Sequence, residues 1–159
     1  MRLSQFSNFA IRLLMYSALR QGQVSTVANM ARAYGISGEH LKKAAAELGR
    51  LGYLTTERGR RGGYRLALDP GAIRIGDVIR QTEGSLALVE CFEPATNTCP
   101  LITACQLRVA LHEATEAFFA ALNRYTLADL IAKPDTLTPL LGIHSDHRPT
   151  RELSPSPGA

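Results

Sequence analysis

The sequence lacks three features that would place the protein in a membrane or outside the cell. No apolar run approaches the length that a membrane-spanning helix needs, so we expect no membrane partner. The first residues, Met1 to Gln5, show neither the apolar stretch nor the small-residue cleavage site of a signal peptide. We therefore expect a cytoplasmic protein, in which thiols stay reduced. Cysteine is also scarce, and the odd number of three excludes complete internal disulfide pairing.

Motifs of enzymes are missing as well. The sequence contains no phosphate-binding nucleotide loop, no HExxH zinc motif and no convincing nucleophile paired with a base. We therefore expect that the protein is not an enzyme. Its 159 residues suit one domain, or one domain with an appended element, and the 45% apolar and 20% charged residues are ordinary for a globular protein.

Positive charge is concentrated in one segment. Between Lys42 and Arg65 there are seven basic and two acidic residues, a net charge of +5, whereas the whole chain carries +4. The remainder therefore carries −1. A local basic patch of this kind is typical of a surface that binds a polyanion, although an unevenly charged solvated surface would look the same.

The basic segment lies within a predicted helix-turn-helix. Apolar spacing predicts helices over residues 4–20, 25–33 and 37–51, with Ser25 and Ser37 as N-caps. Gly35 suits the left-handed residue that ends the second helix. Two short helices joined by a glycine-containing turn, with cations on the second, indicate a DNA-reading motif.

A short hairpin follows this motif. Residues 53–56 and 64–68 are predicted strands, and the glycine-rich reversal between them carries three arginines, which favours an anion opposite over a plain solvated turn. We expect a mostly α fold with a small β-hairpin wing, in which a recognition helix enters the major groove and the wing the minor groove of double-stranded DNA. The candidate DNA-binding residues are Ser37, Glu39, His40, Lys42, Lys43, Arg50, Arg58, Arg60 and Arg61.

All three cysteines, Cys91, Cys99 and Cys105, lie in the stretch "CFEPATNTCPLITAC". Their wide spacing suits a loop that covers an iron–sulfur cluster better than a zinc ribbon, which favours close Cys-x-x-Cys pairs. A disulfide-switched redox sensor is the second alternative and a zinc site the third. Burial as small apolar residues is a further alternative, but the surrounding sequence is too polar for all three.

A long helix is predicted after this loop. Thr103 and Gln106 match a capping box. Six residues then recur at heptad spacing, which favours pairing with a second copy of the chain, although a helix packed on its own domain is the alternative. These residues are Leu107, Leu111, Ala114, Phe118, Ala121 and Tyr125.

We thus expect four regions in the chain. A winged helix-turn-helix domain spans residues 1–83, a cysteine loop 84–105, a dimerisation helix region 103–132 and a tail 133–159 that is largely disordered after 143.

Several motifs together resemble the NsrR family of bacterial repressors, which are relatives of the IscR regulators. They are "YGISGEHL", "LGRLGYLTTERGRRGGYRLA", "IRIGDVIR", "CPLITAC" and "NRYTLADL", and the resemblance covers nearly residues 1 to 133. It implies a homodimeric winged-helix repressor that holds an iron–sulfur cluster, [4Fe-4S] with [2Fe-2S] as the alternative, through Cys91, Cys99 and Cys105. It also implies that nitric oxide nitrosylates the cluster and releases the protein from operators of nitric-oxide detoxification genes.

The fourth ligand of such a cluster is open. At the position of Asn8, NsrR relatives commonly carry an aspartate that reaches across the dimer as the fourth ligand. Arg108 stands where IscR-like proteins have a ligating histidine. Asn8 of the partner subunit, Glu90, Glu93, water and a small thiol are the candidates. Two other functions remain as alternatives: an IscR-like regulator of cluster homeostasis or a thiol redox regulator, and, from another class, a small iron–sulfur electron carrier.

Overall fold

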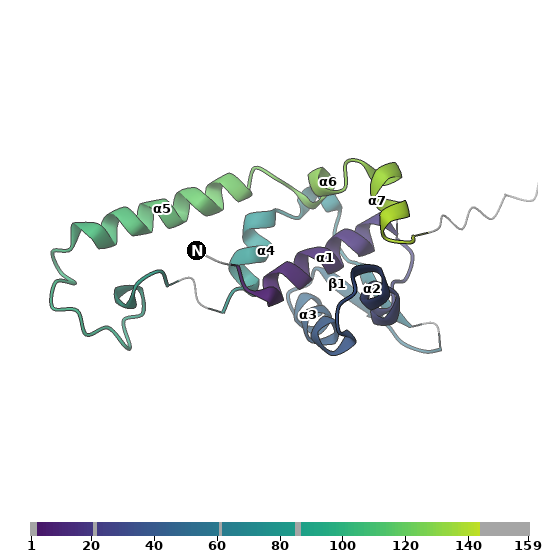
Figure 1. Ribbon diagram of the computed structural model, residues 1–159, viewed down its shortest axis with the longest axis horizontal. Coiled ribbons are helices and arrows are strands. Elements are labelled where there is room, and N and C mark those ends of the chain that lie inside the picture. Colours follow the sequence, from purple (N-terminus) through teal and green to yellow (C-terminus); the bar gives the residue numbers. More distant parts are fainter. Residues whose placement is uncertain (1–2, 21, 61, 85–86, 144–159) are drawn as a thin grey trace, which may run out of the picture.

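The computed structural model describes residues 3–20, 22–60, 62–84 and 87–143. It is mostly helical and has one two-stranded antiparallel hairpin, as the sequence predicts (Figure 1). The elements are α1 (Gln5–Leu19), α2 (Val27–Tyr34), α3 (Gly38–Arg50), β1 (Leu54–Glu57), β2 (Gly63–Leu66), η1 (Pro70–Ala72), α4 (Ile75–Thr82), η2 (Glu90–Phe92), α5 (Gln106–Leu122), α6 (Leu127–Leu130) and α7 (Pro134–Leu140).

Helix α1 is the centre of the core. It contacts α3, α4, α6 and β2, and Leu13 and Leu14 are fully buried. Ser4 caps its first turn by accepting a hydrogen bond from the Ser7 amide at 3.1 Å, which agrees with the predicted start of this helix. Because so many elements pack on one helix, its position fixes the arrangement of the others.

Helices α2 and α3 form the helix-turn-helix. Gly35 ends α2 with φ 63°, a left-handed conformation that a side chain would disfavour, as predicted. The predicted cap is wrong by one residue: Thr26, and not Ser25, accepts the hydrogen bond from Asn29 N. Ser25 is buried instead, where its backbone forms a bridge with Tyr64 of β2.

The hairpin that follows α3 forms the wing. Strands β1 and β2 pair antiparallel from Leu54 opposite Leu66 to Glu57 opposite Gly63. Leu54 is buried against the core, and Tyr64 exchanges two backbone hydrogen bonds of 2.8 Å with Ser25. The base of the wing is therefore tied to the segment between α1 and α2.

A polar junction joins α4 to the end of α5. Asn123 accepts a hydrogen bond from Asp77 N (2.9 Å) and donates one from Nδ2 to Asp77 Oδ1 (2.7 Å). Arg74 Nη1 donates to the Asn123 carbonyl oxygen at 3.0 Å. Gly76 permits this close approach, because a Cβ atom there would meet the Asn123 side chain and, at 2.8 Å, the carbonyl oxygen of Phe119.

Helix α5 starts later than the capping box predicts. Its N-cap is Cys105 and not Thr103, since the Cys105 sulfur accepts a hydrogen bond from Arg108 N at 3.4 Å. The helix extends away from the winged domain and carries the cysteine loop at its far end (Figure 1).

The chain returns to the core after α5. Thr126 and Asp129 form a capping box at the start of α6. The sequence patterns did not predict α7, which begins at Pro134 and is followed by the buried Ile143. The predicted disorder concerns residues 144–159, which lie outside the described residues. Among the helices of the described ranges, none combines the length and apolar character needed to cross a bilayer.

The fit at Gly76 predicts a loss of stability when a methyl group is added. We expect Gly76→Ala to lower the free energy of unfolding by about 1–3 kcal/mol, because the new atom overlaps Asn123 and the Phe119 carbonyl. Urea denaturation followed by circular dichroism measures this change. Gly38→Ala is the matched control, since the nearest atom there is Val27 Cγ1 at an ordinary 3.8 Å. Equal stability of both variants would contradict the role of Gly76.

Candidate DNA-binding surface and cysteine loop

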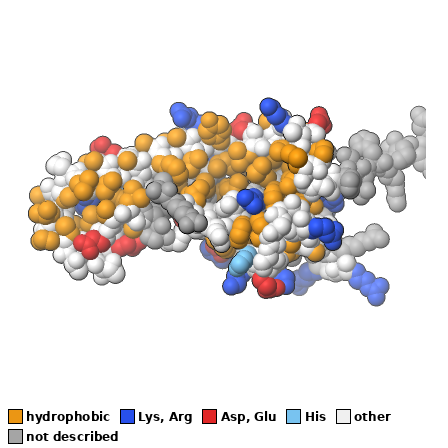
Figure 2. Space-filling view, viewed as in Figure 1, with side chains coloured by type: hydrophobic (Ala, Val, Ile, Leu, Met, Phe, Trp, Pro, Cys, Tyr) orange, Lys and Arg blue, Asp and Glu red, His pale blue; other side chains and the backbone are white. Residues whose placement is uncertain are grey.

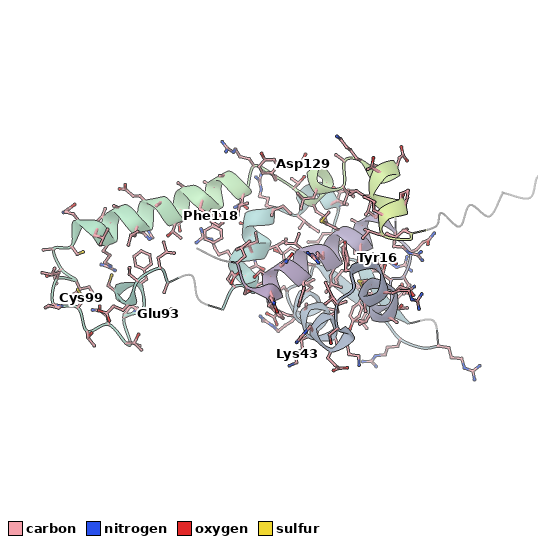
Figure 3. The ribbon with its side chains drawn as sticks, in the orientation of Figure 1. Tyr16, Lys43, Glu93, Cys99, Phe118 and Asp129 are labelled. Carbon is pink, nitrogen blue, oxygen red and sulfur yellow. The ribbon has the colours of Figure 1, made fainter. Side chains whose placement is uncertain are left out.

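The exposed side of α3 carries the predicted recognition residues. Ser37 precedes the helix with no capping hydrogen bond from its side chain, so its hydroxyl is available to an external partner. His40 is exposed and stacks on Phe9 of α1, with ring centroids 5.9 Å apart, which holds the imidazole in one orientation. Lys43 points from α3 to the outside of the molecule (Figure 3). The structure therefore brings these three polar side chains to one accessible surface.

Two of the candidate DNA-binding cations are paired with carboxylates of their own helix. Lys42 Nζ lies 2.7 Å from Glu39 Oε1, and Arg50 makes two hydrogen bonds to Glu47 of 2.9 and 2.6 Å. The hydrogen bond from Lys42 lowers the pKa of Glu39, and that from Arg50 lowers the pKa of Glu47. Both carboxyl groups are therefore ionised at neutral pH. Exposed pairs of this kind are weak, so a DNA phosphate can displace the carboxylate at little cost.

The wing presents cations without such partners. Within the described residues, Arg58 and Arg60 are exposed and form no salt bridge, whereas Arg65 on β2 is paired with Glu57 at 2.6 Å. Arg61, the third predicted wing contact, lies outside the described residues. Basic side chains are visible along the side of the molecule where α3 and the wing lie (Figure 2).

The three cysteines occupy the loop between α4 and α5, and all have free thiols. Cys91 lies in η2 and is buried, whereas Cys99 and Cys105 are half-buried. Among the described residues, no three histidine, cysteine or acidic side chains are gathered as a metal site would require. The thiols thus share one loop but do not converge in this conformation. Cys99 and Glu93 lie together at the end of the molecule remote from Lys43 (Figure 3).

The loop is attached to the rest of the chain at both ends. Where α4 ends, Glu83 Oε1 accepts a hydrogen bond from Ser4 N (2.9 Å), and Thr82 Oγ1 lies 2.9 Å from the buried Ser7 Oγ. At the other end Cys105 is the N-cap of α5. Phe92, next to Cys91, packs edge-on against His112 of α5 with centroids 6.2 Å apart. The loop is therefore flanked by contacts with α1 where α4 ends and is itself in contact with α5.

Three of the six predicted heptad residues are exposed and three are half-buried: Leu107, Ala114 and Tyr125, the last of which follows the end of α5, are exposed, and Leu111, Phe118 and Ala121 are half-buried. Only Thr115 and Phe119 are buried along the length of α5, while Leu107 and Tyr125 are 63% and 54% exposed. Hydrophobic side chains line the projecting helix (Figure 2), and Phe118 points from α5 toward the side of α4 (Figure 3). The sequence left two alternatives for this helix, pairing with a second copy of the chain or packing on its own domain. In the structure, its own domain covers only the part of α5 near α4.

Sequence patterns did not reveal the residue that braces α5 against α4. Arg80 binds Glu116 through two hydrogen bonds of 3.1 and 3.0 Å, and its guanidinium lies 4.1 Å from the centroid of the Phe119 ring. These partners are 36 and 39 positions away, so no local spacing indicates them. Together with Val109 and His112, Arg80 and Glu116 line a cavity of about 550 Å³ beside the loop.

Comparison with known proteins gives one family and two groups of relatives. Residues 3–133 match the Rrf2 family, described as an iron-dependent transcriptional regulator. The HTH-type transcriptional regulator NsrR of Geobacillus kaustophilus is 47% identical over 89% of this chain and 97% of its own length. NsrR of Bacillus subtilis is 41% identical over the same shares. Protein aau3 of Rhizobium meliloti is 42% identical over 94% of this chain and 97% of its own length.

Solved structures of similar fold include a protein that is named as a regulator. IscR of T. potens superposes with a TM-score of 0.65 and 25% identity, covering 83% of this chain and 87% of the other. CymR, the global cysteine regulator of B. subtilis, gives a TM-score of 0.64 at 25% identity over 83% and 97%. Both comparisons agree with a winged-helix fold and with a chain that is a regulator and not an enzyme.

The capping contact at Cys105 predicts different outcomes for two substitutions. We expect Cys105→Ala to lower the free energy of unfolding by about 0.5–1 kcal/mol, because Arg108 N loses its acceptor. Cys105→Ser should keep the stability of the parent chain, since a serine oxygen is a favoured N-cap acceptor. Thermal denaturation of the metal-free protein, monitored at the helical signal, compares the three. A serine variant as unstable as the alanine variant would contradict the capping role.

Proposed function

The chain belongs to the Rrf2 family of transcriptional regulators, and from this premise we propose that it is an iron–sulfur repressor that senses nitric oxide. In this proposal the protein leaves the operators of nitric-oxide detoxification genes when the gas reacts with its cluster. The observation that carries the proposal is a loop with three free thiols, attached to the DNA-binding domain at one end and to α5 at the other. Relatives named NsrR, 41–47% identical over most of their length, support it.

The donor chemistry of the loop fits an iron–sulfur cluster. Cys91, Cys99 and Cys105 supply three sulfur ligands, the kind that such clusters require. Because the thiols do not converge in the described conformation, the loop must draw them together when the cofactor binds. A bound cluster, [4Fe-4S] or alternatively [2Fe-2S], would supply iron with which nitric oxide reacts. The fourth ligand is open, and Asn8 is exposed near the start of α1, where a partner's loop could reach it.

A homodimer through α5 gives the loop its influence on DNA. The uncovered apolar side chains of α5 suit a second copy of the helix, in the manner of a heptad seam. Two winged domains would then stand at a separation set by the two helices, as binding to a double-stranded operator with two half-sites requires. Moving the loop between α4 and α5 changes this separation without touching α3 or the wing.

A thiol switch without a cluster is the second candidate. The same three cysteines are free and at least partly accessible at two positions, Cys99 and Cys105. Oxidation would join two of them as a disulfide and move the loop in a similar way. An IscR-like regulator of iron–sulfur supply would differ from the proposed repressor only in the signal that it senses. A small electron carrier is disfavoured, because a carrier has no use for the helix-turn-helix and wing that this chain builds.

The wing predicts a specific change in salt dependence. Replacing Arg58 and Arg60 together with alanine should weaken operator binding about tenfold or more and lower the slope of log K against log salt by about two, because two phosphate-facing cations are lost. Fluorescence anisotropy with a labelled operator at four salt concentrations measures both quantities. Lys133→Ala is the control, since it removes a positive charge at the start of α7, away from the wing. A slope equal to that of the parent chain would exclude these arginines from the DNA contact.

Replacing a cysteine of the loop should remove the cofactor and the response to nitric oxide together. Cys99→Ser and Cys105→Ser, purified without oxygen, should contain little iron, lack the visible absorption of a cluster and bind the operator identically with and without nitric oxide. Thr103→Ser is the matched control, because it changes the same loop but keeps all three thiols.

The same measurements separate the two candidate functions. If the parent protein contains no iron, and its operator binding responds to a disulfide-forming oxidant but not to nitric oxide, the cluster proposal is wrong and the thiol switch takes its place. Serine variants that keep the iron and the gas response would overturn the assignment of the ligands.

A further inference from the structure

A second cavity lies on the opposite side of the winged domain from the cysteine loop. It measures about 420 Å³ and lies between the end of α1, the exposed side of α2 and the end of α7. Figure 3 shows Tyr16, one of its lining residues, between α1 and α7. The cavity shares no residue with the loop or with the predicted recognition surface of α3.

The lining of this cavity is cationic. Arg20 and Arg32 both face it, together with the Asn29 amide and the Tyr16 phenol, and no acidic residue of the described chain lines it. Two guanidinium groups without a carboxylate between them repel each other unless an anion lies there. This distinguishes them from Lys42 and Arg50 on α3, each of which has a carboxylate of its own helix.

An unsatisfied donor points to the same conclusion. Arg20 Nε is buried and has no hydrogen-bond partner within the described residues. Buried polar groups are almost always hydrogen-bonded, so this nitrogen, which belongs to one of the two arginines that line the cavity, calls for an acceptor. The neighbouring Tyr34, whose ring lies 6.3 Å from that of Tyr16, supplies no negative charge, because burial raises its pKa to about 12.

The remaining wall is apolar. Leu140 and Leu141 of the α7 end line the cavity, and Leu140 is 75% exposed. A planar guanidinium binds a carboxylate through two parallel hydrogen bonds, and leucine side chains favour a hydrocarbon body next to it. We propose that Arg20, Arg32 and Asn29 form a binding site for a small organic carboxylate whose short apolar chain lies against Leu140 and Leu141.

The position of the site connects it to the wing. Gln23 N donates to the Arg20 carbonyl oxygen at 3.0 Å, and two residues later Ser25 exchanges its two backbone hydrogen bonds with Tyr64 of β2. Arg32 and Asn29 belong to α2, the first helix of the helix-turn-helix. A carboxylate that joins Arg20 to Arg32 therefore links the segment that holds the wing to the helix that supports α3, and can change operator affinity.

Titration calorimetry of the full-length protein with acetate, butanoate and hexanoate, at constant ionic strength, tests the site. We expect saturable binding that strengthens by up to about fourfold for each added methylene. Arg20→Gln and Arg32→Gln should each weaken it by about tenfold, because each removes a charge-assisted contact. Arg32 is exposed, so its variant tests the site without risk to the fold. Arg124→Gln, an exposed arginine outside the cavity, should bind as the parent does.

Three results would overturn the proposal. They are the absence of saturable binding to any carboxylate, binding that is unchanged in both cavity variants, and tighter binding of inorganic phosphate than of any carboxylate. Operator binding measured on the same variants tests whether the anion that the two arginines bind is a DNA phosphate. If Arg20→Gln and Arg32→Gln weaken operator binding while no carboxylate binds, the two arginines contact DNA phosphates instead. The site uses none of the cysteines, so its failure and that of the iron–sulfur proposal are distinguishable.

Discussion

The fit of Asn123 against the first turn of α4 determines where α5 points. Helix α5 buries only two side chains along its length, so its own packing does little to orient it. Instead, Asn123 binds both the amide and the carboxylate of Asp77, Gly76 leaves the room for this approach, and Arg80 braces the next turns through Glu116. The result is a helix that is held firmly at its C-terminal end and projects freely at the end that carries the cysteines.

In the proposed function, this arrangement separates the cysteine loop, which would receive the signal, from the surface that would read DNA. Cys99 lies at one end of the molecule and Lys43 at another surface (Figure 3). The helix that leads into the loop is fixed to the core, since Glu83 at the end of α4 accepts a hydrogen bond from Ser4 N and Thr82 contacts Ser7 of α1. A change of about 1–3 kcal/mol in coupling is sufficient for regulation of this kind.

Local sequence signals predicted most of the elements but not their connections. Apolar periodicity located α1, α2 and α3, and the glycine-rich arginine turn located the wing. The cap of α5 was misplaced, because Thr103 with Gln106 is a better local match than a cysteine, and the sulfur contact to Arg108 N appears only in the folded chain. Helix α7 was missed because it contains Pro139, a residue type that disfavours a helix interior. The cavity between Arg20, Arg32 and Leu140 joins segments more than one hundred residues apart, which no spacing rule indicates.

The distribution of charge favours a mechanism that changes the separation of two winged domains and leaves the DNA contacts of each domain intact. The carboxylates of Glu39 and Glu47 already accompany two of the cations on α3, whereas Arg58 and Arg60 on the wing have no described partner. In the proposed complex with DNA the wing would therefore supply most of the salt-dependent attraction, and α3 would contribute oriented groups such as Ser37 and His40. Neither set lies near the cysteines, so in the proposed function modification of the loop would leave the affinity of each single winged domain almost unchanged. It would alter whether the two domains of the proposed dimer meet their half-sites together, and the repressor would lose its operator by losing the second contact.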